Sequence, residues 1–96
     1  MNPRFYFDHA ASSPMVPACR TAFEAYDRAP WAGANPNSLH TSGRCAFEAL
    51  EQARAGIARA LGARRPAEVV FTSGGTEANN LAMAGIAHAA LRKSGG

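Results

Sequence analysis

The chain has 96 residues, of which 47% are hydrophobic and 18% charged, and its formal net charge is +3. This composition excludes a disordered protein, which combines low hydrophobicity with high net charge, and the nine glycines and two cysteines exclude collagen-like and disulfide-scaffold proteins. The length fits one domain or part of one, since domains most often have about 100–150 residues.

Neither a membrane nor a nucleic acid is an expected partner. The uncharged apolar runs are too short for a spanning helix of about 20 residues, and Met1–Asp8 lacks the basic-then-apolar order of a signal peptide. We therefore expect a cytoplasmic protein. The basic residues are scattered, with Arg64 and Arg65 the only adjacent arginines, whereas nucleic-acid binders usually cluster Lys and Arg on one face.

The first half of the chain predicts two helices. After a short extended piece at residues 5–7 and a loop at 8–14, Pro17 favours a helix start, because proline is tolerated in the first turn. We expect this helix from about Val16 to Arg28. A Gly-, Pro- and Asn-rich loop follows, and a second helix starts near residues 38–42. Spacings of three and four place apolar residues on one side of it, at Ala46, Phe47, Leu50, Ala53, Ile57 and Leu61, and Gly62 stands where a left-handed residue would end it.

The second half predicts a strand, a turn and a helix. Residues 68–72 are a short run rich in β-branched residues, which we interpret as a buried strand. Residues 73–76 form a tight turn, and a third helix follows from about Glu77 to Arg92. Strand, glycine turn and helix begin an α/β unit, but one strand cannot complete a sheet. We therefore expect a mainly helical piece of a larger α/β protein, with one core strand.

No metal site is expected. Cys19 and Cys45 form no Cys-x-x-Cys pair and have no histidine at ligand spacing. Both fall in predicted helices, where we expect them to act as small buried hydrophobes. We interpret His9 as a solvated loop residue, His40 as a residue that caps or precedes the second helix, and His88 as a half-exposed residue within the third helix.

The turn at residues 72–76 is the candidate binding site. A helix N-terminus offers unpaired N–H groups and the positive end of the helix dipole to an anion, and Gly74 and Gly75 would let a ligand approach the backbone closely. Thr76 adds a hydroxyl. The turn has neither the lysine of a P-loop nor the Gly-x-Gly-x-x-Gly dinucleotide fingerprint, so a smaller phosphate fits better. The alternative is a plain turn capped by Ser73 or Thr76, with Glu77 complementing the dipole.

Three segments resemble the cysteine desulfurases, pyridoxal-phosphate enzymes of the class V aminotransferase group. They are, in family order, YFDHAASSP at 6–14, GANPNSLH at 33–40 followed by Gly-Arg at 43–44, and FTSGGTEANNLA at 71–82. Small departures are Ser12-Ser13 for the commoner Thr-Thr, an extra Ala34, and Asn37 in place of a serine. Selenocysteine lyases share the Gly-Gly-Thr-Glu form and stay an alternative.

The resemblance implies a fold, a cofactor and partners. It implies the N-terminal portion of a fold-type I pyridoxal-phosphate-dependent transferase, with residues 1–62 on the small-domain side and 63–96 starting the large cofactor-binding domain. Gly75 and Thr76 match the positions that bind the phosphate of pyridoxal 5'-phosphate. The implied reaction takes sulfur from L-cysteine, leaves L-alanine, and passes an enzyme persulfide to sulfur-acceptor or iron–sulfur scaffold proteins. Family members are usually homodimers.

No catalytic residue is expected within these 96 residues. The family needs a Schiff-base lysine and a mobile-loop cysteine, which the resemblance places downstream. The one lysine, Lys93, lies at the far end of the third predicted helix, roughly 25 Å from its start at 1.5 Å per residue. We expect this chain alone to be inactive. The alternative is a non-catalytic remnant or a fragment that docks on a partner.

Overall fold

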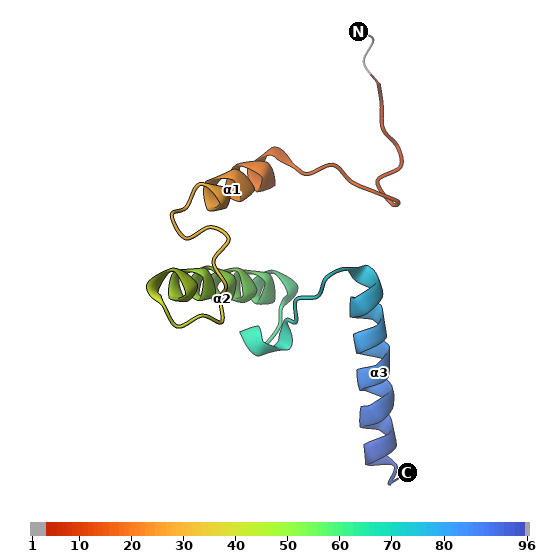
Figure 1. Cartoon of the computed structure of the whole chain (residues 1–96). Helices are drawn as coiled ribbons and strands as arrows, with labels where there is room; N and C mark the ends of the chain where they lie inside the picture. Colours follow the sequence, from red (N-terminus) through yellow and green to blue (C-terminus); the bar gives the residue numbers. More distant parts are fainter. Residues whose placement is uncertain (1–3, 96) are drawn as a thin grey trace. The chain divides into compact units, whose positions relative to one another are not determined.

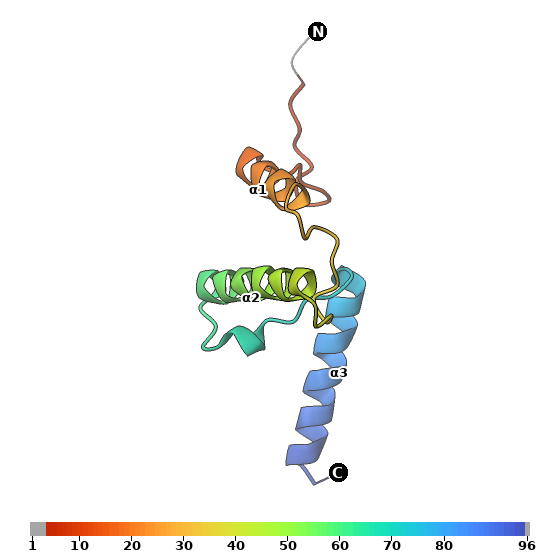
Figure 2. The ribbon, with the colours of Figure 1, turned by 60° about the vertical axis from the view of Figure 1, so that its left-hand side comes forward.

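The computed structural model describes residues 4–95 (Figure 1). Its helical elements, in chain order, are α1 (Pro17–Asp27), α2 (Thr41–Leu61), the short 3-10 helix η1 (Pro66–Glu68) and α3 (Gly75–Lys93). The chain divides into two compact units, residues 1–50 and 51–96, with the boundary inside α2. In both views α2 and α3 run as uninterrupted helices (Figures 1 and 2). The three predicted helices are confirmed.

Proline starts α1 and a loop ends it. Val16 has extended backbone angles and Pro17 is the first helical residue, where its missing N–H costs nothing because that group has no intrahelical partner. At the other end, the Arg28 N–H donates to the Glu24 carbonyl at 3.2 Å. No residue of α1 is buried, which corrects the expected burial of Cys19, an exposed residue; Cys45 on α2 is half-buried.

The start of α2 is packed tightly against the loop before it. The imidazole Nδ1 of His40 accepts the Gly43 N–H at 3.1 Å, so of the two expected places for His40, capping the helix or preceding it, the structure shows the cap. A Cβ built on Gly43 would lie 2.4 Å from the Ser38 carbonyl oxygen and 2.9 Å from that of Asn35. Only glycine fits at this close approach of helix and loop.

Glycine also ends α2. Gly62 has a φ of +73°, and its N–H donates to the Arg59 carbonyl, while the Ala63 N–H donates to the Ala58 carbonyl at 2.9 Å. This pair of bonds is the Schellman pattern, in which a left-handed residue lets the chain turn back and satisfy the last carbonyls. The predicted end of the helix is confirmed.

Little of the apolar surface is covered within the described residues. The hydrophobic residues they bury are Ala46 and Ala58, whereas Phe47 is 49% exposed and Leu61 is 75% exposed. On α3, Ile86 is 72% exposed. The predicted amphipathic pattern of α2 is present in its spacing, but Phe47 and Leu61 on this face stay exposed among the described residues.

The predicted strand at 68–72 is not confirmed. Glu68 ends η1, residues 69–72 belong to no helix or strand, and Val69 has extended backbone angles, φ −97° and ψ 121°. A strand exists only when a neighbour accepts and donates its ladder of hydrogen bonds, and residues 4–95 contain no such neighbour. The segment is therefore extended and unpaired.

Candidate functional site

The turn before α3 leaves several backbone donors free. Gly74 caps the helix with extended backbone angles, φ 171° and ψ 177°, and its carbonyl accepts the Ala78 N–H at 3.1 Å. The N–H groups of residues 75–77 precede that first helical bond, so they have no acceptor within the helix. They lie at the positive end of a 19-residue helix, which favours an anion.

The mouth of the turn is open. A Cβ built on Gly74 or Gly75 would meet no atom within 4 Å, and both glycines and Thr76 are exposed. The Thr72 hydroxyl donates to the Gly74 carbonyl at 2.9 Å, which ties the incoming segment to the cap. Gly75 and Thr76, the two residues expected to bind phosphate, therefore stand side by side at an accessible helix start.

Glu77 stabilises this turn from inside the helix. Its carboxylate accepts the Ser73 hydroxyl at 2.5 Å and the Ser73 N–H at 3.3 Å. Both bonds lower the pKa of Glu77 below its ordinary value of 4.5, and the bond from the Ser73 hydroxyl has the larger effect. The cap residue has no side-chain hydrogen bond of its own, so the alternative of a cap by Ser73 or Thr76 is wrong. The carboxylate reaches back to the turn instead.

This carboxylate makes the turn sensitive to acid. Because the pKa of Glu77 is lowered in the folded state, its bonds to Ser73 contribute stability above the unfolded pKa and lose it as pH falls through the folded pKa. We expect the NMR signal of the Glu77 side chain to titrate below 4.5, and the Ser73 amide shift to follow it. A Glu77→Gln chain should show no such step, and titration of Glu77 at its ordinary value would contradict the contact.

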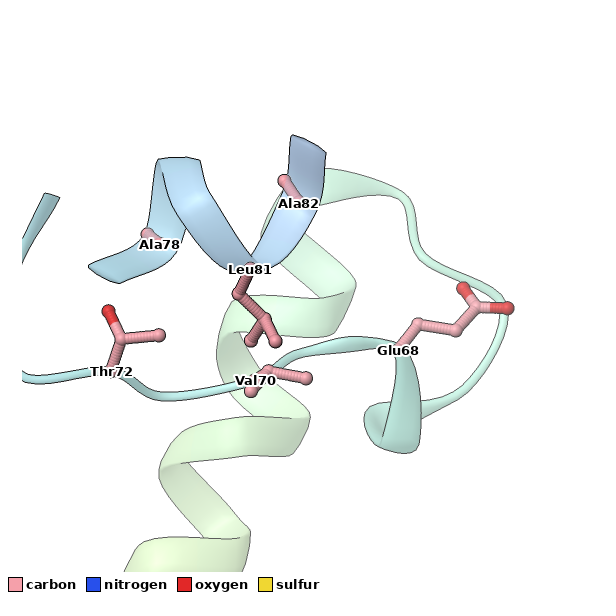
Figure 3. Close-up of a pocket in the computed structure, with 6 residues that line it drawn as sticks. All are labelled: Glu68, Val70, Thr72, Ala78, Leu81 and Ala82. Carbon is pink, nitrogen blue, oxygen red and sulfur yellow. The ribbon is translucent and has the colours of Figure 1, made fainter. Parts of the chain in front are cut away.

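An apolar pocket lies beside the turn. Val70 and Thr72 on the extended segment, together with Glu68 at the end of η1, line a space of about 310 Å³ with Ala78, Leu81 and Ala82 on α3 (Figure 3). In the close-up the side chains of Val70 and Leu81 point toward one another. This pocket is the contact surface between segment and helix, and it offers few polar groups to a ligand.

Arg54 holds the same segment from α2. Its Nη1 donates to the Val69 carbonyl at 2.5 Å, its Nε donates to Glu51 at 3.1 Å, and its guanidinium lies 4.8 Å from the centre of the Phe71 ring. Sequence reasoning missed this residue, because its partners are up to 17 positions away. The hydrogen bonds between Ser73 and Glu77 were also missed. The four-residue spacing of these two residues across a helix start is the signal that could have predicted them.

The remaining candidates do not join this turn. His9 packs edge-on against Tyr6 at a centroid distance of 4.8 Å, and His88 is exposed on α3, more so than expected. Within residues 4–95, no three His, Cys, Asp or Glu side chains are grouped to hold a metal ion. Among the described helices, none is long and apolar enough to cross a membrane.

Comparison with known proteins identifies the family. The family model described as Aminotransferase class-V matches residues 5–95. The chain belongs to the class V aminotransferase family. This family has the fold-type I architecture of pyridoxal-phosphate enzymes, so the predicted α/β class holds at the level of the family. No solved structure matches the chain.

Curated relatives of this class V aminotransferase chain include desulfurases and lyases. It is 54% identical over 81 residues to an IscS-like cysteine desulfurase of Mycobacterium tuberculosis, covering 84% of this chain and 20% of that protein. It is 40% identical over 93 residues to cysteine desulfurase IscS of Dictyoglomus turgidum, covering 97% and 23%. It is 35% identical over 91 residues to selenocysteine lyase of Rattus norvegicus, covering 95% and 19%. The chain thus spans about a fifth of the length of these relatives.

The donors at the start of α3 fit the phosphate of the family's cofactor, pyridoxal phosphate. Three adjacent N–H groups without helical acceptors and the Thr76 hydroxyl can donate to phosphate oxygens. The space beside Gly74 and Gly75 is open enough for close approach. The nearest carboxylate, on Glu77, is turned back toward Ser73.

Proposed function

We propose that this chain is the N-terminal portion of a pyridoxal-phosphate-dependent cysteine desulfurase, and that Gly75 and Thr76 bind the cofactor phosphate. The observation that carries the proposal is the open helix start, where free N–H groups and a hydroxyl converge in a chain of this family. The names and identities of the desulfurase relatives support the choice of reaction.

The chain's own part in the reaction would be to hold and orient the cofactor. When bound, pyridoxal phosphate supplies the electron sink that lets L-cysteine lose its sulfur and become L-alanine. The N–H groups of Gly75 and Thr76 and the Thr76 hydroxyl would fix the phosphate, and Glu77 would keep the turn in shape through Ser73. A phosphate fixed at one end sets the position of the cofactor ring.

The wider setting follows from the same proposal. We propose residues 1–62 as part of the small-domain side and 63–96 as the start of the large cofactor-binding domain, with the full enzyme a homodimer. Its sulfur would leave as a persulfide for sulfur-acceptor or iron–sulfur scaffold proteins. A cytoplasmic location stays a prediction.

Selenocysteine lyase is the second candidate. The observation that favours it is 35% identity over 91 residues to the rat selenocysteine lyase. The two candidates share the phosphate turn and differ in the substrate that donates the chalcogen atom.

The test places this chain in a complete relative. In a chimaera, the matched 81 residues of this chain would replace the corresponding residues of the Mycobacterium tuberculosis desulfurase. Because the chain has 96 residues, any continuous stretch of 81 residues includes residues 16–81. We expect it to bind pyridoxal phosphate and form L-alanine from L-cysteine at a rate near that of the parent. A chimaera that acts only on L-selenocysteine would favour the second candidate. A folded chimaera that does not bind pyridoxal phosphate would contradict both.

On its own the 96-residue chain should be inactive. Lys93 is its single lysine, and it ends α3, roughly 25 Å from Thr76 at 1.5 Å per residue. We expect no sulfide from L-cysteine when the chain is mixed with an equal amount of pyridoxal phosphate, and no stoichiometric label on Lys93 after borohydride treatment. Label on Lys93 together with turnover would show that this chain carries its own catalytic lysine.

A further inference from the structure

Arg54 makes three different contacts from one half-buried position. Its side chain is 21% exposed, and it joins a backbone carbonyl, an aromatic ring and a carboxylate, on Val69, Phe71 and Glu51. The other ion pair among the described residues joins Glu24 on α1 to Arg28 just after that helix, and both side chains are well exposed. A planar guanidinium suits this combination, because it donates in its plane and stacks on its face.

The contacts lie on the segment that leads into the phosphate turn. Val69 and Phe71 flank Val70, so Arg54 fixes the chain at both sides of that residue. The next residue, Thr72, donates to the Gly74 carbonyl at the helix cap. A continuous set of contacts therefore runs from the middle of α2, through residues 69–72, to the cap of α3.

We propose that Arg54 is a positioning residue for the cofactor-phosphate turn. It sets the path of residues 69–72 and thereby the place of the Gly75 and Thr76 donors, and it does not touch the phosphate itself. The inference rests on the proposed function, since it names what orients that site. The geometry favours an indirect role over a direct one, because Glu51 already accepts from Arg54 at 3.1 Å and Nη1 is engaged by Val69.

The test separates positioning of the phosphate from general damage. In the apo form of the chimaera, the affinities for 4′-deoxypyridoxine 5′-phosphate and for 4′-deoxypyridoxine would be measured by equilibrium dialysis. Neither probe has an aldehyde, so neither can form a Schiff base with a lysine. The affinity for the phosphorylated probe divided by that for the unphosphorylated probe therefore reports the phosphate contacts alone, and we call this value the ratio. Arg54→Met keeps the apolar stem, Arg54→Lys keeps the charge, and Arg59→Met, on the exposed side of α2, is the matched control.

We expect Arg54→Met to lower the ratio roughly 2- to 30-fold, the range for residues that affect a ligand without touching it. Arg54→Lys should restore part of the loss and Arg59→Met should change nothing. If Arg54→Met weakens both probes equally, or changes neither, the inference is wrong. If Arg54→Met does not fold, the ratio for Arg54→Lys decides, and a value equal to the unchanged chimaera overturns the inference.

A Thr76→Ala chimaera distinguishes the two levels of the proposal. A ratio that falls for Thr76→Ala but not for Arg54→Met would support the proposed phosphate site and contradict the positioning role of Arg54. A ratio near one in the unchanged chimaera and in both the Thr76 and the Arg54 variants would contradict the proposed phosphate site, and the positioning role of Arg54 with it.

Discussion

Gly43→Ala should destabilise the chimaera strongly. The added Cβ would lie 2.4 Å from the Ser38 carbonyl oxygen, 2.8 Å from the Ser38 Cβ and 2.9 Å from the Asn35 carbonyl oxygen. These are mainly backbone atoms, so the loop must move as a whole, at a cost of about 1–3 kcal/mol or more. The measurement is the free energy of unfolding in urea, compared with that of the unchanged chimaera.

Gly56→Ala is the control in the same helix. A Cβ there would meet only the tip of the Arg59 side chain, at 3.9 Å, and replacing a glycine inside a helix favours folding by about 0.8–1 kcal/mol. The two substitutions should therefore have opposite signs. A Gly43→Ala chimaera as stable as the Gly56→Ala one would show that the loop before α2 does not pack as described.

Thr76→Ala should weaken cofactor binding without unfolding the protein. Thr76 is exposed at the second position of α3, and alanine is a good helix former, so the turn should survive. A hydrogen bond to a charged group is worth about 1.5–3 kcal/mol, which predicts a loss of about 10- to 150-fold in affinity for pyridoxal phosphate. Reconstitution of the apo chimaera, followed by the absorbance of bound cofactor, measures it.

The conservative variant decides whether the hydroxyl is responsible. Thr76→Ser keeps the hydroxyl and should retain most of the affinity. Equal affinity in the alanine and threonine forms would show that the Thr76 hydroxyl does not bind the phosphate.

The helices were predictable because local chemistry sets their ends. Pro17 starts α1 and Gly62 ends α2 with a φ of +73°, and both effects act within one turn. The strand was not, because the segment predicted as a strand, residues 68–72, needs hydrogen-bond partners that no residue within 4–95 provides. Its extended backbone follows from local preference, whereas pairing depends on another strand.

The candidate turn was predictable from residue type, but the side-chain contacts that stabilise it were not. Gly75 and Thr76 stand out as glycine and hydroxyl at a helix start. The bond from Ser73 to Glu77 spans four residues rather than the three of a capping box, and the contact of Arg54 with Val69 spans 15 positions. Contacts of that range depend on how the segment packs on α2.

The burial of large side chains was the least predictable feature. Spacing placed Phe47 and Leu61 on one face of α2, yet both are exposed. Periodicity shows which face is apolar, and whether that face is covered depends on what packs against it.

The most direct test is a crystal structure of the chimaera with bound 4′-deoxypyridoxine 5′-phosphate. We expect phosphate oxygens within about 2.7–3.2 Å of the Gly75 and Thr76 backbone nitrogens and about 2.5–3.0 Å of the Thr76 hydroxyl oxygen. We also expect Glu77 to accept from Ser73 and Arg54 to contact Val69, as they do here. A phosphate bound elsewhere, with the start of α3 empty or covered by a side chain, would contradict the proposed phosphate site.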